Sequence, residues 1–168
     1  RYREHHARLR LANVRFVLSF RPLPDDLVRL RGEARIPEVE EPLRLFELRE
    51  PLPRAFMAPL HEVVPDREEL RRRLSSVDFD PRGLVLLEEP PEAPPGGSPP
   101  PSAERPGEVR YELLDAHTVR LEARGPSGIV VVLDEHHRDW KAYSKGESRP
   151  LLRADGRYRA VATKGGSE

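Results

Sequence analysis

Ile129-Val130-Val131-Val132-Leu133 consists only of apolar residues, four of them β-branched. Branching at Cβ favours extended backbone, and residues of a strand point alternately to its two faces. A run that is apolar on both faces therefore predicts a central strand that is covered on both sides. We expect this strand to lie in the middle of a β-sheet.

The sequence around this strand predicts further antiparallel strands. Residues 108–113 and 118–123 each alternate polar with apolar, and a turn at Asp115-Ala116 separates them, which indicates a hairpin with one wet face. Lys145-Gly146 and Asp155-Gly156 mark two more tight turns. Three shorter strands are expected beside these turns, near residues 141–144, 149–153 and 157–162. Residues 108–168 thus predict an antiparallel β-sandwich or meander.

Residues 1–88 predict a mixed α and β portion with one helix, near residues 66–76. Asp66 can cap the free amides of the first turn, and Glu69 follows three residues later, as a capping box requires. Leu70, Leu74 and Val77 then form one apolar stripe. Strands are expected near residues 14–20 (with one face fully buried), 27–36, 43–48, 55–64 and 83–88. The predicted fold class is mainly β with one helix, an α+β arrangement.

Residues 89–107 separate the two portions. This stretch contains eight prolines, together with glycine and serine, and no large apolar residue. Such a segment cannot bury enough surface to offset the entropy lost on ordering. It is interpreted as a mobile loop or linker, either a long surface loop inserted between two strands or a true interdomain linker.

Composition excludes several functional classes. The 168 residues contain 29 acidic and 29 basic side chains, so there is no net charge to attract nucleic acid or an anionic membrane surface. The absence of cysteine excludes disulfides, a cysteine nucleophile and a thiolate metal site. No apolar run approaches the roughly 20 residues of a membrane helix. Residues 1–10 lack the apolar core of a signal peptide.

The segment from Asp134 to Trp140 concentrates groups that could bind a ligand. It follows the central strand, so it should lie on a loop at one end of the sheet, where binding residues are common. Trp140 could stack against a sugar ring, while His136, His137 and Asp139 bond its hydroxyl groups. In the alternative interpretation, Trp140 plugs the open end of the sandwich and the polar residues are simply solvated.

No catalytic or cofactor motif accompanies this segment. The six histidines lack the spacing of a metal site, because the adjacent pairs point to opposite faces of a strand. The chain also lacks a Gly-x-Ser-x-Gly motif, a phosphate-binding loop and a dinucleotide fingerprint. We therefore expect no catalytic residue, metal or cofactor, and a stand-alone hydrolase is the least favoured of the functions considered.

Four stretches in the same order resemble one protein family. Asn13-Val14-Arg15-Phe16-Val17-Leu18-Ser19 is the first, and Leu43 to Leu48 with Leu52-Pro53-Arg54-Ala55-Phe56 is the second. The glutamate-rich helix and Val85-Leu86-Leu87-Glu88 follow. The ending, from Val130 through Trp140-Lys141-Ala142-Tyr143 to Val161, is the fourth. Together they resemble the C-terminal part of YfhO-type bacterial membrane proteins, although that family's Pro-Gly before the tryptophan is Arg138-Asp139 here.

The resemblance implies a context and a function. Members of that family are polytopic and look like lipid-carrier-dependent glycosyltransferases of the GT-C type, with catalytic acids in a loop that has no counterpart here. The chain would be an extracytoplasmic, non-catalytic domain at the bacterial cell membrane that assists in positioning a glycan or acceptor. Its expected partners are the membrane-embedded part of the same polypeptide and a glycan or lipid-linked sugar, and not nucleic acid. The alternative is a structural or protein-interaction module with no small ligand.

Overall fold

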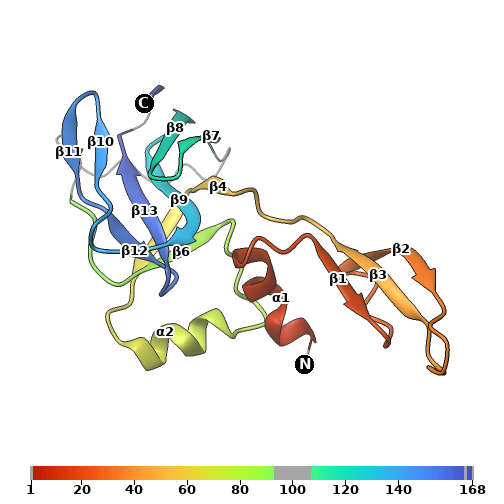
Figure 1. Ribbon diagram of the computed structural model, residues 1–168. Helices are drawn as coiled ribbons and strands as arrows, with labels where there is room; N and C mark the ends of the chain where they lie inside the picture. Colours follow the sequence, from red (N-terminus) through yellow and green to blue (C-terminus); the bar gives the residue numbers. More distant parts are fainter. Residues whose placement is uncertain (1, 93–106, 165, 168) are drawn as a thin grey trace.

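A six-stranded sheet lies at the centre of the fold (Figure 1), in the computed structural model that describes residues 2–92, 107–164 and 166–167. Its strands are β4 (Ala55–Ala58), β5 (Leu60–Val63), β6 (Leu84–Leu87), β9 (Gly128–Glu135), β12 (Leu152–Ala154) and β13 (Tyr158–Thr163). Their order across the sheet is β4-β9-β13-β12-β6-β5, and only β5 and β6 run parallel to each other. The apolar run of residues 129–133 lies in β9, which is an interior strand as predicted.

Three smaller sheets and two helices complete the fold. A sheet with the order β1-β3-β2 contains β1 (Phe16–Ser19), β2 (Val28–Ala34) and β3 (Leu43–Leu48). Another, with the order β14-β8-β7, contains β7 (Glu108–Asp115), β8 (Thr118–Gly125) and β14 (Gly166–Ser167). The last is a hairpin of β10 (Ala142–Ser144) and β11 (Glu147–Arg149). The helices are α1 (Tyr2–Leu11) and α2 (Arg67–Leu74). The prediction of a mainly β, α+β fold is confirmed.

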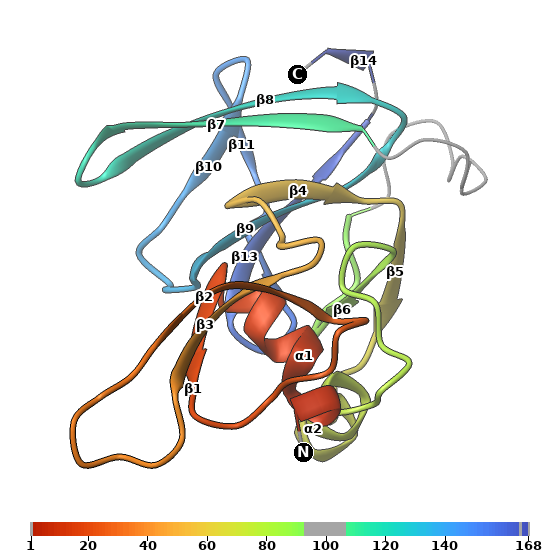
Figure 2. The ribbon, with the colours of Figure 1, turned by 90° about the vertical axis from the view of Figure 1, so that its right-hand side faces the viewer.

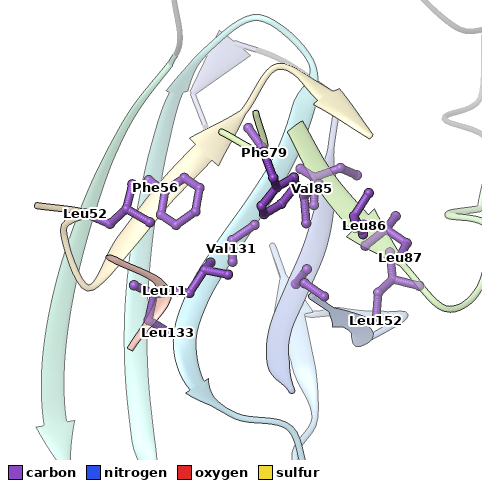
Figure 3. Close-up of a cluster of buried hydrophobic side chains, with 14 of the residues drawn as sticks. Leu11, Leu52, Phe56, Phe79, Val85, Leu86, Leu87, Val131, Leu133 and Leu152 are labelled. Atoms are coloured by element: carbon purple, nitrogen blue, oxygen red, sulfur yellow. The ribbon is translucent and has the colours of Figure 1, made fainter. Parts of the chain in front are cut away.

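The central sheet is covered on both faces, which explains the apolar character of β9. Figure 2 shows the β7–β8 hairpin on one side of the sheet and both helices on the other. Ile129, Val131 and Leu133 belong to the main core on the helix side, which Figure 3 shows together with β6. Val130 points the other way, toward β8, and packs with Met57 and Ala123. The arrangement is sandwich-like, with the second layer formed by the hairpin.

Strands from both sides of the proline-rich segment contribute to the central sheet. β4, β5 and β6 precede residues 89–107, whereas β9, β12 and β13 follow them. The predicted portions 1–88 and 108–168 therefore do not form separate sheets. The local sequence pattern could not show this, because pairing between distant strands leaves no mark in it. Most of the predicted mobile loop, residues 93–106, lies outside the described residues.

The predicted tight turns are present. Lys145 and Gly146 have φ values of 52° and 83°, and they connect β10 to β11. Asp155 and Gly156, with φ values of 50° and 71°, connect β12 to β13. Positive φ at both central residues is the geometry of a type I′ turn, which glycine and aspartate adopt most easily.

The predicted helix near residues 66–76 is α2. The Glu69 N–H donates to Asp66 Oδ1 at 2.7 Å, so Asp66 is the N-cap. Leu70 is buried in the core, and Leu74 packs against its edge. Val77 lies beyond the end of the helix and is 62% exposed, so the predicted apolar stripe is one residue too long.

We expect Asp66→Ala to lower the free energy of unfolding by about 1 kcal/mol, because an amide of the first turn loses its acceptor. Urea denaturation measures this change. Asp78→Ala is the matched control, since Asp78 is also an exposed aspartate close to α2 but caps no helix. Equal losses in the two variants would contradict the capping role.

The prediction of a single helix is wrong, because α1 is a second one. Its polar, basic sequence has only two buried apolar side chains, Ala7 and Leu11. Tertiary contacts hold it instead. Arg10 is buried, donates from Nε to the carbonyl oxygen of Glu50 at 3.0 Å and pairs with Asp80 at 2.9 Å. These partners are distant in sequence, so local periodicity gives little sign of the helix.

The prediction that β1 buries one face fully is also wrong. Phe16 and Leu18 point to the same face of the β1-β3-β2 sheet and are 48% and 63% exposed, and Phe20 just beyond them is 41% exposed. The buried residues of this sheet, Val28, Phe46 and Leu48, lie on its other face. Periodicity identifies an apolar face correctly, but it does not show whether another element covers that face.

Candidate ligand groove

A groove of about 710 Å³ opens between β8 and the central sheet. At one end the two layers touch, where Met57, Ala123 and Val130 form a buried cluster. The groove continues from there to the β7–β8 turn at His117, and the β10–β11 hairpin borders it along the side. The two layers of the sandwich are therefore closed at one end and separated at the other.

The interior surface of the groove is apolar because of the strand alternation. Val130 pairs with Val161 across β9 and β13, so both side chains lie on the face that β8 covers. Val119 and Leu121 of β8 point back toward them. All four line the groove and none is an exposed residue, so a ligand in the groove would contact an aliphatic surface.

A charged network supports Trp140 at the edge of this surface. The Arg159 guanidinium lies 4.1 Å from the centroid of the half-buried indole, a cation–π contact. Arg159 Nη2 donates to Asp134 Oδ2 at 2.5 Å. Asp134 also pairs with Arg54 and accepts from the Tyr111 hydroxyl at 3.4 Å. One face of the tryptophan ring thus packs against the Arg159–Asp134 ion pair, whose side chains are each 10% exposed.

Arg159 keeps one donor unused in this network. Burial lowers the pKa of its guanidinium, and the neighbouring Asp134 carboxylate opposes that change. Arginine nevertheless stays cationic in proteins. Its Nε is buried without a hydrogen-bond partner among the described residues, although Arg159 lines the groove. An unpaired buried N–H costs stability, so Arg159 is held here by its contacts with Asp134 and Trp140 despite that cost.

Basic side chains dominate the rim. Lys141 and Lys145 flank β10, and within the described residues neither ammonium group has an ion-pair partner. Among the described residues, the one ion-pair partner of Arg149 in β11 is Glu147, at 3.5 Å. Asp139 is the one carboxylate among the described lining residues. The groove therefore carries an excess of positive charge in a chain whose total charge is zero.

The structure brings two of the four predicted site residues to the groove. Trp140 and Asp139 line it, whereas His136 and His137 are not among its lining residues. His136 is half-buried on the adjoining loop, where its backbone N–H donates to the Arg157 carbonyl oxygen at 2.8 Å. His137 is exposed, with Nδ1 3.2 Å from Asp139 Oδ2. Neither histidine therefore lines the groove.

Sequence reasoning missed the residues that β13 and the β10–β11 hairpin contribute. Arg159 is one of many arginines, and only the register of β13 against β9 places it beside Val132 and under Trp140. A weak sequence signal could have identified Lys141 and Lys145 as site residues. They are two of only three lysines in the chain, and they lie at the two ends of the strand predicted near residues 141–144, directly after the tryptophan.

Among residues 2–92, 107–164 and 166–167, no group of three or more histidine or acidic side chains gathers as metal ligands. Neither helix of this part of the chain has the length and hydrophobicity needed to cross a membrane.

Fold and groove together define a mainly β, sandwich-like protein with a basic-rimmed apolar groove beside its single tryptophan. Comparison with protein-family models, with curated proteins and with solved structures gave no match. The resemblance to YfhO-type membrane proteins stays a prediction that rests on the motifs quoted above.

Proposed function

We propose that this chain is a non-catalytic, extracytoplasmic domain of a membrane-bound glycosyltransferase-like protein, and that its groove positions a glycan or acceptor. One observation carries the proposal: the only tryptophan is half-buried in the wall of a groove large enough for a small ligand. Ligand pockets typically have volumes of about 300–1,000 Å³ and combine an apolar lining with a few polar groups.

The lining supplies the contacts that a saccharide needs. An indole face packs against the C–H groups of a sugar ring, and Arg159 holds the ring of Trp140 in place. Asp139, Ser144 and Arg149 offer acceptors and donors for hydroxyl groups at the rim. Hydrolysis of a glycosidic bond ordinarily uses two facing carboxylates, whereas the described lining has one. This chemistry favours binding over catalysis.

Trp140→Ala tests the proposal directly. We expect the variant to stay folded and to lose binding to glucose-, galactose- and N-acetylglucosamine-based oligosaccharides by at least tenfold, because the stacking surface is gone. NMR titration measures binding, and thermal unfolding measures the fold. Phe20→Ala, which removes an exposed aromatic side chain just beyond the end of β1, should leave binding unchanged. Unfolding of Trp140→Ala would instead support the interpretation that Trp140 is a core plug.

The membrane context of the proposal rests on the family resemblance. If it is correct, the reading frame that encodes this chain also encodes many membrane-spanning helices, and the domain lies on the extracytoplasmic face. The membrane-embedded part of the same polypeptide would then be its partner. A reading frame without such helices would overturn the family assignment.

A second candidate function is a structural or interaction module without a small ligand. The exposed apolar face of the β1-β3-β2 sheet, with Phe16 and Leu18, favours it. Exposed apolar faces mark interaction sites in many proteins. This face would pack against the membrane-embedded part of the same polypeptide. Oligosaccharide titrations without any response near Trp140 would support this candidate over the first.

A further inference from the structure

We propose that the groove binds an amphipathic anion, namely an aliphatic chain that ends in a carboxylate or phosphate. The inference rests on the proposed function in one respect only, since both place a ligand in the same groove. It adds a chemical class that stacking on Trp140 does not require. Two features of the groove support it: its apolar interior and its unpaired lysines.

The apolar interior fits an aliphatic chain. Val119 and Leu121 face Val130 and Val161 across the groove, and these aliphatic side chains continue into the buried cluster that contains Met57. A saccharide stacked on Trp140 at the rim would leave this interior unfilled, because its hydroxyl groups would find no hydrogen-bond partner there. A methylene chain has no such groups. The interior of the groove therefore suits the apolar half of a ligand.

The rim fits an anionic head group. Four basic side chains line the groove (Lys141, Lys145, Arg149 and Arg159), against the single carboxylate of Asp139. Only Arg159 has a buried acidic partner. Since the whole chain has equal numbers of acids and bases, this excess is local to the groove. Ammonium groups form strong, charge-assisted hydrogen bonds with carboxylate or phosphate oxygens.

Trp140 provides the test because it is the only tryptophan and it lines the groove. Its fluorescence is followed during titration with decyl phosphate, decanoate, decanol and inorganic phosphate. We expect decyl phosphate or decanoate to bind at least tenfold more tightly than decanol, and inorganic phosphate alone not to saturate. The first two ligands distinguish a phosphate from a carboxylate head group.

Charge reversal at the rim isolates the role of the lysines. Lys141→Glu/Lys145→Glu should bind decyl phosphate at least tenfold more weakly and keep its affinity for decanol. Lys164→Glu is the matched control, because Lys164 is the third lysine, is exposed and is not among the lining residues. Reductive methylation gives a second readout. Decyl phosphate should protect Lys141 and Lys145 from the reagent and leave Lys164 reactive.

Contradictory results are distinguishable from failure of the proposed function. Equal binding of decyl phosphate, decanoate and decanol, or equal effects of the two charge reversals, would overturn the anionic part of the inference. Binding of oligosaccharides without any response to the decyl compounds would overturn the inference and leave the proposed function intact. Binding of decyl phosphate or decanoate without any oligosaccharide would support the inference alone.

Discussion

Asp155→Asn is expected to raise the free energy of unfolding by up to about 4 kcal/mol at pH 8 and to change it little at pH 4. Asp155 is 4% exposed in the turn between β12 and β13. Its Oδ1 accepts from the Leu86 N–H at 3.0 Å, but Oδ2 is buried without a partner among the described residues. A charge at this position is poorly compensated.

Burial raises the pKa of the Asp155 carboxyl from 3.8 to about 7, although the Leu86 hydrogen bond favours the charged form. Below pH 4 the carboxyl is protonated in both the folded and the unfolded chain, so its burial has no ionisation cost. Between pH 4 and 7 only the unfolded chain releases the proton, and stability falls as pH rises. Above pH 7 the full penalty is present.

Asparagine fits this position without charge. Its amide oxygen can accept the Leu86 N–H, and asparagine tolerates the positive φ of residue 155. Urea denaturation of both proteins between pH 4 and 8 gives the difference in unfolding free energy, in which contributions of other groups cancel. Asp78→Asn, at an exposed aspartate, should show no such trend. A difference that stays constant over this pH range would contradict the prediction.

Asp134→Ala is expected to lower the free energy of unfolding by about 3–5 kcal/mol, because it leaves a buried guanidinium without its counter-charge. The Asp134 and Arg159 side chains are each 10% exposed and joined at 2.5 Å. Removing the carboxylate also frees the guanidinium to turn away from Trp140. A shift in tryptophan emission should therefore accompany the loss of stability.

Two further variants separate the buried pair from its exposed neighbour. Arg54 also pairs with Asp134, but its side chain is 51% exposed. Arg54→Met should therefore lower the free energy of unfolding by less than about 1 kcal/mol. The double variant Asp134→Ala/Arg159→Met should recover much of the stability lost in Asp134→Ala, since no unpaired charge remains. Urea denaturation measures the stability of the wild type and the three variants, because guanidinium chloride would screen the ion pairs. A double variant that is no more stable than Asp134→Ala would contradict the coupling.

Local patterns predicted much of this fold. The apolar run of β9, the alternation of β7 and β8 and the capping box of α2 each lie within a few residues, so sequence alone identifies them. The α1 helix and the partners of β4 in the central sheet depend on contacts between distant residues. For the same reason, the proline-rich segment could not reveal that one sheet contains strands from both sides of it.

The groove was only partly predictable. Trp140 and Asp139 were recognised because unusual residues gather in one short segment. Other lining residues of the groove come from three different strands: Val130 from β9, Arg159 and Val161 from β13, and Val119 from β8. Two layers that separate at one end create the groove, and no local sequence pattern records that separation.

The indole N–H resonance of Trp140 gives the most direct test of a ligand in this groove, because the chain has a single tryptophan and thus a single such signal. We predict that the signal shifts and saturates in a ¹H–¹⁵N spectrum as a bound oligosaccharide or decyl phosphate is added. Residues of β8 and β13 should shift with it. An unchanged indole signal with all ligands, or shifts confined to the β1-β3-β2 sheet, would contradict a ligand site at Trp140.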